Sequence, residues 1–316
     1  MKETNNMQEN ELYFDDDEID LRELFNVLWT AKKLIIQITA IFAIGSVVYS
    51  LSLNNHYKSE SLFLARSASE NQGLSQYSSL AAMAGISLPS SREDKAAQMI
   101  ELIKSRKFVK HLMTFENILP SILAAKSYNN STQELLFNQK LYESETKTWK
   151  NKPKNNRTMI PSYLEAHKAY LGMLSIAQDK KTGFISINIE HISPVFAKDF
   201  LELIIRESNE LLRKKDMEES KQGLEYLTSE LSKTPFVEIK ESINALIEAQ
   251  LETQMLSQLN QDYILIEIEP PFIPEQKSKP SRAFICVTGT MLGGMLSVLI
   301  VLIRHYSFAE EDQAVE

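Results

Sequence analysis

Two long apolar stretches, one near each end of the sequence, constrain this chain more than any other feature. Residues 34–53 and 283–303 contain no charged side chain. Roughly 20 helical residues at about 1.5 Å each match a hydrocarbon core of about 30 Å. We therefore predict two transmembrane helices. An even number of crossings would put the tails, 1–33 and 304–316, on one side of the membrane and residues 54–282 on the other.

The charge distribution supports a retained first helix and argues against nucleic-acid binding. Residues 34–53 are longer than the apolar core of a secretory signal, and the leader before them is acidic. The two tails carry formal charges of −5 and −3, which account for the whole net charge of −8. The remainder of the chain is balanced, so the sequence predicts no basic surface for nucleic acid.

Basic residues beside the two stretches predict the orientation. Three bases lie shortly before the first stretch: Arg22, Lys32 and Lys33. Basic residues near a membrane helix stay cytoplasmic, which favours cytoplasmic tails. Three others precede the second stretch and favour the opposite orientation: Lys277, Lys279 and Arg282. Because the first helix usually dominates and long loops translocate largely regardless of charge, we predict that residues 54–282 form a periplasmic domain.

Three segments of this domain are typical of strands. Residues 57–66 follow the first apolar stretch, 183–191 read GFISINIEH, and 263–274 read YILIEIEPPFIP. The first and last of these lie next to the two membrane stretches in sequence. We therefore predict a small sheet close to the membrane.

The helical segments predict a long hairpin. Ser193 followed by Pro194 is a strong helix start, and no further proline occurs before Pro235, so a helix of roughly 35 to 40 residues is expected. A second helix after Pro235 would return antiparallel to it. Residues 94–113 predict one amphipathic helix. Two stretches are predicted to be mostly loop: 67–92 and 127–158. The expected fold is an α+β membrane protein with a membrane-proximal sheet and a projecting helical hairpin.

The sequence contains no recognisable catalytic or metal-binding pattern. The five histidines lack metal-ligand spacing, and the single cysteine, Cys286, lies within the second apolar stretch. We therefore predict no enzyme activity, no cofactor and no metal site. An enzyme acting on periplasmic glycans would need a carboxylate pair in a cleft. Three acids could be considered for that role, although solvated helix faces explain them more simply: Glu165, Glu190 and Glu241.

The sequence around the second apolar stretch carries a recognisable pattern. Prolines in the connector 270–280 fix φ and favour an extended chain. Small residues follow at steps of four, at Gly289, Gly293 and Ser297, and predict a face for close helix packing. The pattern consists of Pro271, Pro274, Lys279-Pro280-Ser281 and Gly293-Gly294-Met295.

A second pattern precedes the first apolar stretch. It consists of Asp17, Glu18, Ile19, Asp20 and Leu21, followed by Leu24, Leu28 and Trp29. The apolar residues among them, together with Phe25, also form an amphipathic stripe that could lie at a membrane interface. Trp29 would then be an interfacial aromatic residue.

Through these two patterns the chain resembles the polysaccharide co-polymerase family, the Wzz-type chain length determinants without a fused kinase. It departs from the family pattern in the order Lys-Pro-Ser and in Leu296-Ser297-Val298, where a run of small residues is more usual. The resemblance implies an inner-membrane homo-oligomer with no catalytic activity. It also implies action with a polysaccharide polymerase, weak contact with the growing glycan, and control of glycan length, most often of lipopolysaccharide O-antigen.

Three alternatives remain open at this stage. Within the same structural class, the protein could serve capsule or exopolysaccharide polymerisation and export. The second alternative, a two-span membrane sensor, would need a signalling domain, which we do not expect in the thirteen residues 304–316. A fused kinase would need a phosphate-binding loop, which we do not expect there either. An enzyme acting on periplasmic glycans is the third alternative.

Overall fold

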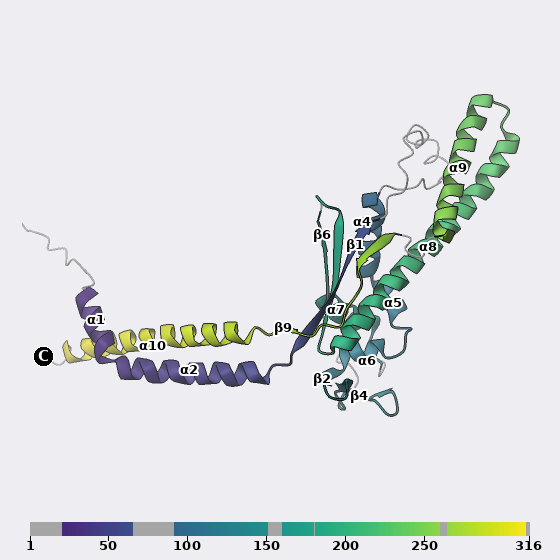
Figure 1. Cartoon of the computed structure of the whole chain (residues 1–316). Helices are drawn as coiled ribbons and strands as arrows, with labels where there is room; N and C mark the ends of the chain where they lie inside the picture. The colour runs from purple at the N-terminus through teal and green to yellow at the C-terminus, as the bar shows by residue number, and fades with distance from the viewer. Residues whose placement is uncertain (1–20, 66–91, 151–159, 180, 260–263, 314–316) are drawn as a thin grey trace, which may run out of the picture. The chain divides into compact units, whose positions relative to one another are not determined.

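The computed structural model describes residues 21–65, 92–150, 160–179, 181–259 and 264–313. The chain divides into two compact units (Figure 1). The terminal unit consists of Met1–Leu53 and Ser281–Glu316, and the central unit of Asn54–Pro280.

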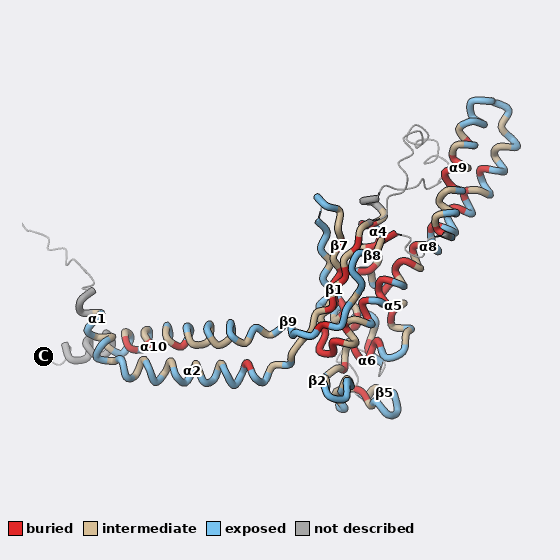
Figure 2. The backbone as a smooth tube through the Cα atoms, in the orientation of Figure 1, coloured by how far each residue is buried: buried red, intermediate tan, exposed pale blue. Residues whose placement is uncertain are grey.

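The terminal unit is helical. It contains α1 (Leu21–Thr30), α2 (Lys32–Ser52) and α10 (Arg282–Gln313), and α2 and α10 lie side by side (Figure 1). Lys32–Ser52 and Arg282–His305 are long and apolar enough to cross a membrane. Only 6% and 17% of the residues in their most apolar windows are buried, so most of their apolar side chains face outward (Figure 2). A lipid environment suits such surfaces. Helix α10 continues beyond residue 303, where the sequence predicted a tail.

The central unit is built on a five-stranded antiparallel sheet. Its strand order is β6-β7-β1-β8, and β9 also pairs with β1. The strands are β1 (His56–Ala65), β6 (Leu174–Gln178), β7 (Phe184–His191), β8 (Leu265–Glu269) and β9 (Lys277–Lys279). The prediction that the strands flanking the two apolar stretches meet in one sheet is confirmed by the pairing of β1 with β8. The sequence did not reveal β6 or β9.

One face of this sheet supports the main core. Ser59, Ser61 and Phe63 alternate along β1 and are at most 1% exposed. Opposite them on β7 lie Ile189, Ile187 and Ile185, all fully buried. Helices α4, α7 and α8 pack against these strands. The alternation therefore places one half of each strand beneath the helices, and this half is apolar on β7 but contains Ser59 and Ser61 on β1.

The long hairpin consists of α8 (Pro194–Lys233) and α9 (Val237–Leu259). Ser193 caps α8, since its hydroxyl accepts a hydrogen bond from the Phe196 N–H, and Pro194 occupies the first turn. Both the predicted start and the 40-residue length are confirmed. The early part of α8 belongs to the main core, whereas its later part packs on α9 around a second, smaller cluster. That cluster comprises Leu227, Ile243 and Leu246.

The single helix predicted over 94–113 is wrong. The chain forms α4 (Arg92–Lys104) and α5 (Arg106–Leu112), separated at Ser105. The Ser105 hydroxyl accepts a hydrogen bond from the Phe108 N–H, and Ser105 itself is extended. A serine that caps a new helix is compatible with an uninterrupted apolar period, which explains the error.

The loop predicted over 127–158 is also wrong in part. It contains two small hairpins, β2 (Ala125–Asn129) with β3 (Glu134–Phe137), and β4 (Tyr142–Glu143) with β5 (Thr148–Trp149). Aromatic packing supports them, with ring centroids of Tyr142 lying 5.5 Å from Phe137 and 5.1 Å from Trp149. Residues 151–158, and nearly all of the predicted loop 67–92, lie outside the described residues.

Two short helices complete the central unit, and the sequence did not reveal either. They are α6 (Ile118–Leu123) and α7 (Tyr163–Met173). The sequence does contain a start signal for α7, because Ser162 and Glu165 form a reciprocal capping box.

Candidate functional site

The small-residue face of α10 contacts α2 of the same chain. A Cβ built on Gly289 would lie 2.5 Å from the Ser46 Cβ, and one on Gly293 would lie 2.4 Å from the Phe42 Cβ. Ser297, one turn further on, is fully buried. The predicted close-packing face is therefore occupied by the chain's own first apolar helix. Glycine permits this approach because any side chain would hold the backbones apart.

The two adjacent glycines of the predicted pattern are not equivalent. A Cβ on Gly294 would meet only the Thr39 hydroxyl oxygen, at 4.0 Å. The Gly294 carbonyl accepts a hydrogen bond of 2.7 Å from the Ser297 hydroxyl. Gly289 and Gly293 thus form the contact with α2, whereas Gly294 lies beside it.

The proline connector runs along β1 and is held by serine side chains. Pro270 and Pro271 lack N–H groups, so β8 cannot continue its backbone ladder through them. The Ser61 hydroxyl instead donates to the Glu269 carbonyl at 2.6 Å, and the Ser59 hydroxyl donates to the Phe272 carbonyl at 2.8 Å. Of the motif prolines, Pro274 is buried, and Pro271 and Pro280 are half-buried. Between β8 and β9 the connector has no regular secondary structure and bends at residues 275–276.

Beyond the prolines, β9 restores the pairing and is fixed by a carboxylate. His56 and Tyr57 of β1 pair with Lys279 and Lys277. Glu190 of β7 accepts hydrogen bonds of 2.6 Å from both the Ser278 hydroxyl and the Lys279 ammonium. Burial alone would raise the pKa of Glu190, but these two hydrogen bonds and the nearby charge of Lys279 outweigh it and lower the pKa.

The N-terminal pattern lies mostly outside the described residues. Asp17, Glu18, Ile19 and Asp20 precede them, and Leu21 begins α1. Within α1, the Phe25 and Trp29 rings stack with centroids 5.9 Å apart, and the Lys32 ammonium lies 4.6 Å above the Trp29 ring. Phe25 and Trp29 are exposed, and the interfacial position of the stripe stays a prediction.

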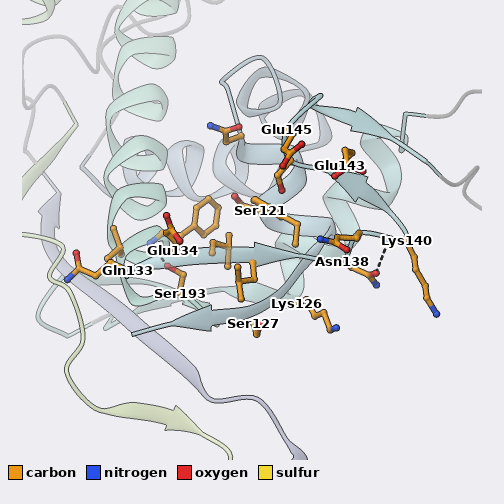
Figure 3. A pocket seen from close by; sticks show the side chains of 18 of the residues that line it. Ser121, Lys126, Ser127, Gln133, Glu134, Asn138, Lys140, Glu143, Glu145 and Ser193 are labelled. Carbon is orange, nitrogen blue, oxygen red and sulfur yellow. Dashed lines mark hydrogen bonds between the residues drawn. The ribbon is translucent and has the colours of Figure 1, made fainter. Parts of the chain in front are cut away.

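A separate candidate site lies in the central unit. A pocket of about 950 Å³ is bounded by α6, the β2–β3 hairpin, β4 and the start of α8 (Figure 3). This volume is near the upper end of ordinary ligand sites. Its lining includes hydroxyl and amide side chains, among them Ser121, Ser127 and Asn138, and side chains of both charges.

A buried histidine, His191, contacts three of the residues that line this pocket. His191, at the end of β7, donates from Nε2 to the Ser121 carbonyl at 3.0 Å, and its Nδ1 accepts the Ser193 N–H at 3.1 Å. Its ring packs on Phe196 at a centroid distance of 4.5 Å. Burial lowers the pKa of His191 to about 4, so the ring is neutral near pH 7. Three pocket residues, Ser121, Ser193 and Phe196, are thereby fixed relative to one another.

The acids considered for catalysis do not come together. Glu165 completes the cap of α7, Glu190 binds β9, and Glu241 is exposed on α9. Within the part of the chain that the structure describes, no group of three or more His, Cys, Asp or Glu residues could hold a metal ion.

Sequence reasoning missed several residues of both candidate sites. The helix partners Phe42 and Ser46 lie far from Gly293 in sequence, and the serines of β1 resemble ordinary strand residues. For the pocket, the apolar run Leu135-Leu136-Phe137 was the available signal, but it is short and surrounded by polar chain.

Comparison with known proteins gives a family match and matches to solved structures. A family model for the chain length determinant protein, Wzz, matches residues 17–115. A solved structure described as a full-length bacterial polysaccharide co-polymerase is similar at 13% identity, with a TM-score of 0.42, over 92% of this chain and 99% of that chain. No curated protein matches this chain.

Proposed function

We propose that this chain, whose residues 17–115 match the family model for the chain length determinant protein, Wzz, is a non-enzymatic membrane scaffold that regulates the length of a surface polysaccharide. The first candidate is lipopolysaccharide O-antigen, extended by a separate Wzy-type polymerase. The family match is the observation that carries this proposal. It includes α2, with which α10 pairs, and β1, with which β8 and β9 pair.

The proposed topology places the central unit in the periplasm. Helices α2 and α10 would cross the inner membrane, with α1 and the end of α10 on the cytoplasmic side. The outward-facing apolar residues of both helices support this proposal, as do the bases at the start of α2. The bases before α10 favour the reverse orientation, so the topology needs its own test.

The proposed mechanism is geometric. Several copies would associate into a homo-oligomer, the membrane helices would contact the polymerase, and the central units would contact the growing glycan weakly. The 40-residue α8, held by α9, supplies a long rigid element for such an assembly. Glycan length would then depend on how the assembly holds polymerase and polymer together.

Deletion of the gene from the source strain tests the function. We expect the gel profile of surface lipopolysaccharide to lose its modal band cluster and become randomly distributed, and a plasmid copy to restore it. An unaltered lipopolysaccharide profile with shortened or lost capsule would transfer the function to capsule or exopolysaccharide. No change in either polymer would refute length control.

Cysteine labelling tests the topology. In a Cys286→Ala background the chain has no other cysteine, and Glu225 on α8 and Asn26 on α1 are both exposed. We expect Glu225→Cys to react with an impermeant maleimide in spheroplasts, and Asn26→Cys to react only after the membrane is permeabilised. The opposite labelling would reverse the orientation.

A further inference from the structure

We infer that the pocket between the β2–β3 hairpin and the start of α8 binds a segment of the glycan, and that it selects a neutral, hydroxyl-rich chain over an acidic one. This inference rests on the proposed function and specifies where and how the polymer is contacted. The pocket lies in the central unit, outside both sequence patterns and outside residues 17–115.

The polar lining suits sugar hydroxyl groups. Ser127, Gln133 and Asn138 contribute groups that can donate and accept hydrogen bonds, as a sugar hydroxyl does (Figure 3). The Asn138 Oδ1 already accepts the Lys140 N–H at 3.1 Å, which orients the amide. Several such groups around one open space match a polymer that presents many hydroxyls and few other groups.

The charges of the pocket do not favour a polyanion. Two lysines, Lys126 and Lys140, are accompanied by four acids, Glu134, Glu143, Glu145 and Asp199. Lys150 pairs with Glu143, and Lys198 lies 3.5 Å from Asp199 and 2.5 Å from Glu202, so the region keeps a small excess of acids. A glycan rich in carboxylates would meet at least as many acids as bases. A neutral chain is not repelled by these carboxylates.

One wall of the pocket is apolar and held in place. Phe196 and Val195 of α8 line it, together with the half-exposed Leu136 of β3. The Phe196 ring lies between His191, at 4.5 Å, and Phe200, at 5.1 Å, so its position is fixed by the core. An apolar wall beside polar groups complements a sugar ring, which presents C–H groups on its faces and hydroxyls at its edges.

Saturation-transfer NMR on the full chain in nanodiscs tests the inference. The probe is the polysaccharide released by mild acid from the lipopolysaccharide of the source strain, with a polygalacturonate oligomer as the acidic comparison. We expect signal transfer to the neutral polysaccharide. Ser127→Trp should weaken apparent binding by about tenfold by filling the pocket. Thr132→Trp, on the same hairpin but outside the lining, should bind as the wild type does.

A charge variant keeps the test informative if the filled pocket misfolds. Asp199→Lys should increase transfer to polygalacturonate, whereas Glu225→Lys, an equal charge change later on α8, should not. Equal binding by wild type and a folded Ser127→Trp, no transfer from the wild type, or preference of the wild type for polygalacturonate would each overturn the inference. Gel profiles of the same strains separate the two proposals. If the chain controls glycan length but binds no glycan, only the inference about the pocket is refuted. The proposed function is tested by loss of length control when the gene is deleted.

Discussion

The close approach of α2 and α10 makes Gly293 the position where a single methyl group should matter most. A Cβ there would lie 2.4 Å from the Phe42 Cβ and 2.8 Å from its Cγ, so Gly293→Ala requires the helices or the ring to move. At Gly294 the nearest atom, the Thr39 Oγ1, is 4.0 Å away. Replacement of glycine by alanine changes helix propensity by about 1 kcal/mol at either position. The difference between the two variants therefore isolates the contact.

The expected difference follows from the cost of overpacking. Extra atoms forced into a packed interface typically cost about 1–3 kcal/mol. We expect Gly293→Ala to lower the free energy of unfolding of the terminal unit by about 1–3 kcal/mol relative to Gly294→Ala. Gly294→Ala itself should be neutral or slightly stabilising.

Unfolding of the purified full chain by sodium dodecyl sulfate in mixed detergent measures this difference. The chain has two tryptophans, so a Trp149→Phe background leaves Trp29 as the reporter of the terminal unit. Equal unfolding midpoints for the two alanine variants would refute the packing argument. In cells, Gly293→Leu should shift modal glycan length more than Gly294→Leu.

Three further predictions concern the central unit. The unfolded chain binds a proton at His191 near pH 6.5, whereas the folded chain binds it only near pH 4, so the free energy of unfolding should fall by up to about 3 kcal/mol as the pH is lowered from 6.5 to 4. His191→Gln should reduce this loss, measured by urea unfolding followed by Trp149 fluorescence. Ser61→Ala removes the donor to the Glu269 carbonyl and should lower the free energy of unfolding by about 1–2 kcal/mol in the same assay, whereas Ser175→Ala on the exposed part of β6 should change it little. Tyr170→Phe removes the hydrogen bond from a buried hydroxyl to the Ile103 carbonyl and should cost about 1–3 kcal/mol, and an unchanged unfolding midpoint would contradict the role of that bond.

The elements that the sequence predicted correctly are those with local signals. The start of α8 at Ser193 and Pro194 is local backbone chemistry, and the two apolar helices are identified by length and composition. The core strand β7 was found because four of its residues are apolar and β-branched or aromatic. None of these predictions required knowledge of distant neighbours.

The predictions were wrong or incomplete where tertiary contacts determine the local structure. The break at Ser105 falls within an apolar period that fits one helix as well as two, and the β2–β3 hairpin is stabilised by rings from separate strands. The neutral state of His191 depends on burial that its sequence neighbours do not indicate. The same reason explains why Gly293 could be predicted to contact a helix, whereas its partner, Phe42, could not be named.

The way the central unit holds its own ends helps to explain how a modest helix contact can suffice in the terminal unit. The chain leaves α2 and enters β1, and it leaves β9 to enter α10. Because His56 pairs with Lys279, the residue where β1 begins and the residue where β9 ends are neighbours within the central unit. The entropic cost of bringing the two helices together is then largely met by the fold of the central unit. Packing at Gly289 and Gly293 needs only to select the register of the pair, since the encounter of the helices is already intramolecular.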